Sequence, residues 1–267
     1  MSFHRILLAF LLYTISLTSA LQCTVDCSFK SDLDTPFEIP KSCNQSQSSI
    51  QCAFRMSYWY HRYYSYLSFE IGQANGSSGM YHSTGVRFSN DGSLSFDYSV
   101  SHLCDHSDDC AIEFATKTMS GLLQRLKFNY TTLGEELWPL LASSSPIEDA
   151  DLSCFDSDEN IRQCGLVTRP GICQGAQRLR RNSRTNRGCN NQLYGNDKSV
   201  TAYDFGNFGS FEIRCNRSLC NGPLTFQAVK DVMFKYNITK TVDGQLSQGI
   251  RHSLSFIFVI LIIIRLI

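Results

Sequence analysis

Alternation of apolar and polar residues predicts β-structure in the first half of the chain. It runs from Leu67 to Ile71, as in a strand with one buried face. It also runs on both sides of the turn sequence Asn90-Asp91-Gly92, from Val86 to Phe88 and from Leu94 to Val100. An Asp-Gly turn between two alternating segments predicts a β-hairpin.

The period then changes to that of a helix. Apolar residues fall at helical spacing between Ile112 and Leu126, with charged residues on the other faces. We expect one amphipathic helix packed on the sheet, with Met119 filling the core. Residues 22–141 are thus expected to form a cysteine-containing, β-rich extracellular domain with one helix.

The two ends of the chain indicate export and membrane attachment. Residues 1–20 have the basic start, apolar run and small residues of a signal peptide. Leu254–Ile267 is almost wholly apolar but shorter than the roughly 20 residues of a spanning helix. With the polar spacer before it, this tail fits a GPI-attachment signal over 244–267, with Asp243 as the attachment residue and 223–243 as a stalk. A short transmembrane helix from Ile250 is the alternative, and both place the protein on the outer face of the plasma membrane.

Cysteine content agrees with the secretory pathway. All 12 cysteines lie between Cys23 and Cys220, and an even count in an exported chain favours disulfides. The sequons predict a glycoprotein with sugars at Asn44, Asn75, Asn129, Asn216 and Asn237.

Composition also predicts a boundary. Residues 142–153 are Ser-rich, contain Pro146 and then turn acidic, as linkers do. The cysteines divide evenly around this segment. Six precede it, namely Cys23, Cys27, Cys43, Cys52, Cys104 and Cys110; six follow, namely Cys154, Cys164, Cys173, Cys189, Cys215 and Cys220.

The second cysteine set ends in Cys215-Asn-Arg-Ser-Leu-Cys220-Asn221. This ending resembles that of the Ly6/uPAR family of three-finger domains, and the resemblance covers residues 154–221. It implies a mainly β, disulfide-rich three-finger domain over 154–222. The implied pairs are Cys154 with Cys173, Cys164 with Cys189, and Cys215 with Cys220. It also implies that Asn221 hydrogen-bonds to the backbone near the start of the domain. The first finger is short, and the family's disulfide at the base of finger three has no counterpart here.

A basic run lies on the second of these implied fingers. It consists of Arg178, Arg180, Arg181, Arg184 and Arg187. In the family, fingertips bind partners, so we expect these residues to contact an acidic receptor surface or a sulfated glycan. A solvated loop is the plain alternative, and Arg178-Leu-Arg180-Arg181 also matches a secretory processing site.

Other chemistry has little support in the sequence. His102, Cys104, Asp105, His106 and Cys110 could form a zinc site, but in an exported chain the cysteines are expected in disulfides. A formal net charge of zero gives no reason to expect nucleic acid as a partner. The tyrosines between Tyr58 and Tyr66 fit a packed sheet face as well as a binding face.

These patterns together predict a function in binding. We expect a non-enzymatic, GPI-anchored cell-surface protein without cofactor or metal that binds and modulates a membrane receptor or channel. The alternative is a structural or adhesive surface glycoprotein that acts through its N-terminal domain.

Overall fold

The computed structural model describes residues 20–73, 76–143, 152–164, 171–179, 185–190, 198–205 and 208–246. The expected signal peptide, apart from its last residue, and the tail from residue 247 lie outside these ranges. Within them the fold is mainly β and disulfide-rich, as the sequence predicts.

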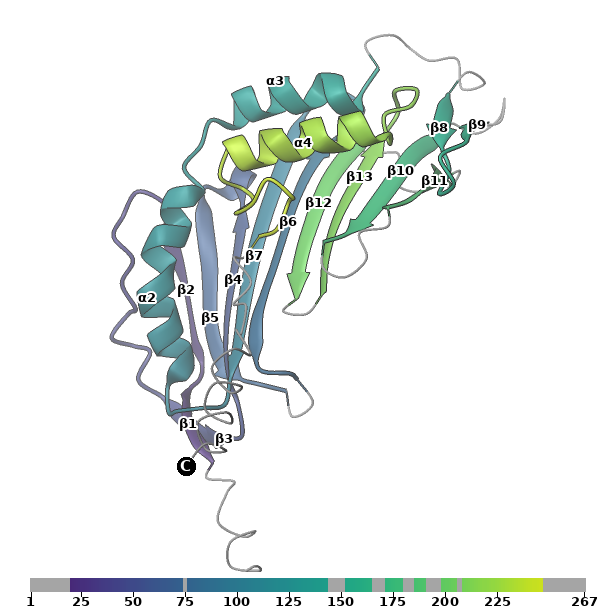
Figure 1. Ribbon diagram of the computed structural model, residues 1–267. Coiled ribbons are helices and arrows are strands. Elements are labelled where there is room, and N and C mark those ends of the chain that lie inside the picture. The colour runs from purple at the N-terminus through teal and green to yellow at the C-terminus, as the bar shows by residue number, and fades with distance from the viewer. Residues whose placement is uncertain are drawn as a thin grey trace, which may run out of the picture.

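A single antiparallel sheet of nine strands dominates the described part of the chain (Figure 1). Its strands are β2 (Cys27–Asp32), β4 (Cys52–Trp59), β5 (Tyr64–Ile71), β6 (Gly79–Phe88), β7 (Leu94–Cys104), β10 (Ile172–Arg178), β11 (Thr185–Asn190), β12 (Lys198–Phe205) and β13 (Phe208–Cys215). They are arranged in the order β11-β10-β13-β12-β6-β7-β4-β5-β2. Two small ribbons flank it: β1 (Leu21–Thr24) pairs with β3 (Ser46–Ser49), and β8 (Ser153–Phe155) pairs with β9 (Ile161–Gln163).

The predicted hairpin is confirmed as β6 and β7. Their register places Phe88 opposite Leu94. Gly92 lies in the connecting turn with a φ of +83°, a conformation that glycine adopts without steric cost. The predicted alternation in β5 is present in part, since Leu67 and Phe69 are buried but Ile71, expected on the same buried face, is 42% exposed.

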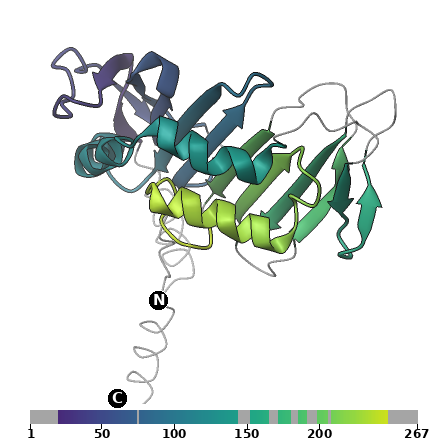
Figure 2. The same cartoon turned by 90° about the horizontal axis from the view of Figure 1, so that it is seen from above.

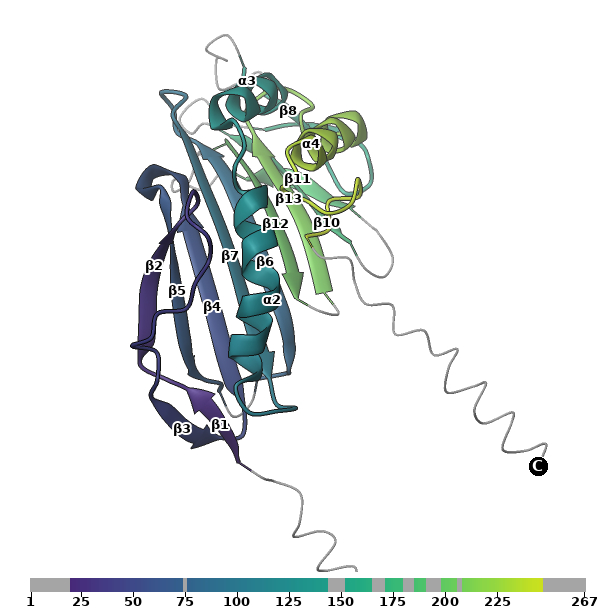
Figure 3. The ribbon, with the colours of Figure 1, turned by 90° about the vertical axis from the view of Figure 1, so that its left-hand side faces the viewer.

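Helices cover one face of the sheet (Figure 2). They are α2 (Cys110–Arg125), α3 (Tyr130–Leu141) and α4 (Pro223–Lys235), and a single 3-10 turn, η1, spans Tyr60–Arg62. The helix expected around Met119 is α2, and Met119 is fully buried as predicted. Figure 3 shows α2 lying along the sheet and α4 beside α3.

The expectation of one helix and a stalk is wrong for the described residues, because α3 and α4 also pack on the sheet. Pro223 begins α4 with its φ already suited to a helix. Phe226, Val229 and Met233 then follow at helical spacing and are buried. Residues 223–235 are therefore part of the fold.

The sheet crosses the expected domain boundary. Strand β12 pairs with β6 over the full length of β12, from Lys198 opposite Phe88 to Phe205 opposite Tyr81. Val86 and Val200 face each other there and are fully buried, and burying a valine contributes about 1.5–3 kcal/mol. The disulfides follow the expected division of the chain, and the sheet does not.

Candidate functional site

Six disulfides join all 12 cysteines. In the second half the pairs are Cys154–Cys173, Cys164–Cys189 and Cys215–Cys220, in agreement with the pairing implied by the resemblance. In the first half they are Cys23–Cys52, Cys27–Cys43 and Cys104–Cys110. Disulfides at this density indicate an extracellular or secreted protein.

Asn221 holds the base of the second half together. Its side chain is fully buried. Its Oδ1 accepts a hydrogen bond from the Phe155 backbone N–H at 2.9 Å. Its Nδ2 donates to the carbonyls of Phe155 at 2.8 Å and Gln174 at 3.0 Å. Asn221 thus connects the end of this half to β8 and β10, which is the role that the resemblance implies.

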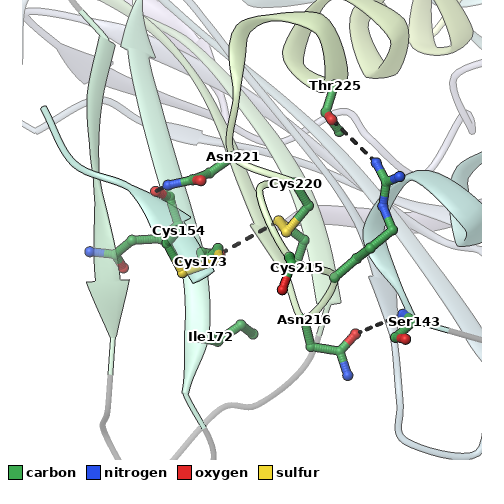
Figure 4. The surroundings of a disulfide bond; sticks show 12 residues. Ser143, Cys154, Ile172, Cys173, Cys215, Asn216, Cys220, Asn221 and Thr225 are labelled. Atoms are coloured by element: carbon green, nitrogen blue, oxygen red, sulfur yellow. Dashed lines mark hydrogen bonds between the residues drawn. A yellow bond between two sulfur atoms is a disulfide. The ribbon is translucent and has the colours of Figure 1, made fainter. Parts of the chain in front are cut away.

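The loop closed by Cys215–Cys220 is attached to the end of α3 (Figure 4). The Asn216 backbone N–H donates to the Leu141 carbonyl at 2.9 Å, and Asn216 Oδ1 accepts from the Ser143 N–H at 3.3 Å. This loop therefore fastens the second half to a helix of the first half.

The predicted glycosylation sites differ in their surroundings. Asn44, Asn129 and Asn237 are exposed, and Asn216 is half-buried. Asn129 caps α3, its Oδ1 accepting from the Thr132 N–H at 3.1 Å. Asn75 lies outside the described residues.

The basic run is only partly described. Arg178 is exposed at the end of β10, whereas Arg180, Arg181 and Arg184 lie outside the described residues. The Arg187 side chain is 8% exposed, donates from Nε to the Asn221 carbonyl at 2.9 Å and pairs with Glu159 at 3.2 Å. Arg187 therefore stabilises the base of the second half, around Asn221, and we leave it out of the partner-binding surface.

The cysteines of the zinc candidate are joined to each other, because Cys104 and Cys110 form a disulfide. His102 stacks on Phe114, with ring centroids 4.0 Å apart. Burial lowers the pKa of His102 to about 4. Three cysteine sulfurs, those of Cys154, Cys164 and Cys189, also lie close together, but each belongs to a disulfide.

The chain around Asp243 is folded on both sides of that residue. Asp243 itself is exposed. Gly244 has a φ of +90°, and a Cβ there would lie 2.7 Å from the Phe211 ring. Leu246 is only 1% exposed and belongs to the core. Removal of everything after Asp243 would therefore take a core residue with it.

The face of the sheet opposite the helices carries a row of aromatic side chains. We call Tyr81, Tyr203, Phe205 and Phe208 the aromatic row. Phe205 is 40% exposed and Phe208 is 45% exposed. Their rings stack 6.5 Å apart, and Phe205 also lies 5.9 Å from Tyr203 and 5.8 Å from Tyr81. Their neighbours Ala202, His82 and Phe211 point the other way, into the core.

A hollow of about 240 Å³ adjoins the aromatic row. Tyr81 and Phe205 form one side of it, and Arg55 lies on the other, paired with Glu70 at 2.5 Å. Serines line its floor, where Ser83 Oγ and Ser99 Oγ share a hydrogen bond of 2.7 Å. The hollow thus combines apolar rings, hydroxyls and a cation, a mixture suited to binding a polar surface that bears apolar groups.

The sequence contained a signal for this site. Tyr203 and Phe205 alternate with core residues in β12, so they had to lie together on one face. The alternation does not tell which of the two faces the helices cover.

Comparison of the chain with protein-family models gives no match, and neither does comparison with curated protein sequences. Among the described residues, no helix is long and apolar enough to span a membrane.

Proposed function

We propose that this protein is a non-enzymatic binding protein of the outer cell surface, which binds and modulates a membrane receptor or channel through the helix-free face of its sheet. The observation that carries the proposal is the aromatic row. Exposed Phe and Tyr side chains grouped on a rigid sheet are typical of the centres of protein interfaces, because they bury large apolar areas with little loss of side-chain entropy.

The basic run adjoins this row. Arg178 lies opposite Ser210 in the register of β10 and β13, and Phe208 is two residues from Ser210 on the same face of β13. One partner can therefore contact the aromatic row and the start of the basic run together. An acidic, partly apolar protein surface would complement both.

Membrane attachment remains part of the proposal. We propose a lipid anchor joined after Leu246, because Gly244 and Leu246 belong to the fold. The resemblance to Ly6/uPAR proteins supports such an anchor, and it supports receptor modulation as the outcome of binding.

Binding of the soluble protein to cells tests the proposal. We expect Phe205→Ser with Phe208→Ser to reduce cell-surface binding at least tenfold, since each exposed aromatic at an interface centre contributes about 1–2 kcal/mol. Leu224→Ser is the matched control, because Leu224 is 86% exposed on α4, on the opposite face. Charge reversal of Arg180 and Arg181 tests the fingertip separately. Unchanged binding of the double Phe variant would refute the aromatic row as the binding surface.

A separate observation, two exposed tyrosines in the N-terminal half, favours the adhesive alternative. Tyr63 is 67% exposed and Tyr66 is 42% exposed, at the far end of the sheet from the aromatic row. If Tyr63→Ser with Tyr66→Ser removes binding and the Phe variant does not, the N-terminal half carries the interaction and the alternative is correct.

A further inference from the structure

A second cavity, separate from the aromatic row, lies on the helix-covered side of the sheet. Its volume is about 400 Å³. It is bounded by α2, by β6 and by the chain after α4, which folds back beneath that helix (Figure 1). We call it the α2 cavity; its polar lining comes from His82, Lys117, Thr118, Arg125 and Lys240, and its apolar lining from Met80, Leu122 and Leu246.

Cations gather at this cavity. Arg125 is fixed in place, since its Nε and Nη2 donate to the Asn237 carbonyl at 3.1 and 2.8 Å and its Nη2 also donates to the Ile238 carbonyl at 3.2 Å. Burial and the nearby Arg125 charge both lower the pKa of Lys240. Two like charges held together at one cavity repel each other, and a bound anion would relieve that repulsion.

His82 adds a buried polar atom without a hydrogen-bond partner. The residue is 4% exposed, and its Nδ1 lies 2.8 Å from the Tyr98 hydroxyl. Its Nε2 has no partner within the described structure. Burial, together with the Arg125 and Lys240 charges, lowers the pKa of His82 to about 4, so the ring is neutral at pH 7.

The neighbours of Tyr98 decide which ring nitrogen of His82 carries the proton. Burial raises the pKa of the Tyr98 hydroxyl overall, whereas the positive charge of Arg125, which lies near that hydroxyl, acts to lower this pKa. A nearby positive charge favours the arrangement in which the hydroxyl oxygen faces Arg125 and its proton points to His82 Nδ1. Nε2 then carries the ring proton and is a donor.

Acidic groups nearby are already engaged. Glu113, on α2, pairs with Lys117 at 2.5 Å. Asp204 lies opposite His82 in the register and is buried, and it interacts with another group of the protein. Neither carboxylate is among the residues that line the cavity.

We propose that the α2 cavity binds a phosphate group carried on a small apolar body. Arg125, Lys240 and the His82 Nε2–H come from three different elements, and donors that converge from several directions suit a tetrahedral oxyanion. The cavity has room beyond the phosphate, and Met80, Leu122 and Leu246 would contact the apolar part. A soluble phosphomonoester and a phospholipid headgroup share this chemistry.

Titration calorimetry of the full-length protein in neutral detergent tests the site. The probes are inorganic phosphate, n-butyl phosphate and dihexanoyl phosphatidic acid. We expect saturable binding, tighter for butyl phosphate than for phosphate. If butyl phosphate binds more tightly than the phosphatidic acid, the natural ligand is a soluble phosphomonoester. If the phosphatidic acid binds more tightly than butyl phosphate, the natural ligand is a phospholipid headgroup.

Two variants test separately the positive charge at the α2 cavity and the space inside it. Lys240→Gln should weaken binding about tenfold, as loss of one charge-assisted hydrogen bond does. Gly121→Leu should abolish binding without changing any charge, because a Cβ at Gly121 meets nothing within 4 Å and the side chain would extend into the cavity. Lys235→Gln, the same charge change on α4, and Gly121→Ala are the controls. The proposal would be overturned if none of the three probes bound saturably to the unmodified protein. It would also be overturned if Lys240→Gln and Gly121→Leu both bound the probes with the affinity of the unmodified protein.

Discussion

Replacement of Asn221 by Ala should be among the most damaging single changes in the second half of the chain. The side chain is fully buried, and its removal withdraws the partner of the Phe155 N–H and of the Phe155 and Gln174 carbonyls. A buried backbone group left without a partner costs about 1–3 kcal/mol, although the carbonyls can relax toward other donors. We expect a loss of about 2–4 kcal/mol, a large share of the roughly 5–15 kcal/mol that stabilises a typical domain.

Urea unfolding of the secreted protein, with its disulfides intact, measures this loss. The midpoint should fall while the slope with denaturant stays the same, because the surface exposed on unfolding hardly changes. Asn190→Ala is the matched control; Asn190 is half-buried and makes a 3.4 Å hydrogen bond to Gln174 Oε1, so its replacement should cost less than about 1 kcal/mol. Asn221→Asp should be at least as harmful as Ala, since it directs a carboxylate oxygen at the Phe155 and Gln174 carbonyls. If Asn221→Ala unfolds at the same urea concentration as the unmodified protein, the assignment of Asn221 as the fastening residue fails.

Three further changes test other parts of the fold. A chain ending at Asp243 should be about 1.5–3 kcal/mol less stable to urea than one ending at Leu246, since burial of a leucine contributes that amount; equal stability would favour anchor attachment at Asp243. The folded-state pKa of His82 is lowered to about 4 from an ordinary 6.5, so between these pH values the unfolded chain binds a proton that the folded protein does not. The free energy of unfolding should therefore fall by about 3 kcal/mol as the pH drops from 6.5 to 4, and His82→Gln should flatten that part of the stability curve; an unchanged slope would contradict the buried, neutral state. Cys220→Ala should prevent surface display, because it opens the loop that positions Asn221 and leaves Cys215 free; flow cytometry showing normal surface levels would argue against this role.

Local signals in the sequence were sufficient for some elements. The hairpin of β6 and β7 follows from Asp91-Gly92 between alternating segments, and α2 follows from its apolar spacing. The spacing of Phe226, Val229 and Met233 would also have identified α4, but their position between a disulfide-bonded domain and a membrane tail suggested a stalk. In α3, Gly134 and Pro139 weaken the helical signal, and packing against the sheet compensates for them.

The pairing of β6 with β12 could not be predicted in the same way. The two strands are separated by more than 100 residues, and no turn between them fixes their register. Any strand edge offers unpaired N–H and C=O groups, so the sequence pattern of one strand does not identify the strand with which it pairs. The aromatic row was missed for the same reason, because it forms only when β6, β12 and β13 lie side by side.

The most direct test of the proposed function is site-specific photo-crosslinking on intact cells. A photoreactive phenylalanine would replace Phe205 in the aromatic row or Leu224 on α4, both of which are exposed. We expect the residue at position 205 to link to a cell-surface protein and the residue at position 224 to form no such link. Crosslinking from position 224 with none from position 205 would show that the helix-covered side, and not the open face of the sheet, binds the partner.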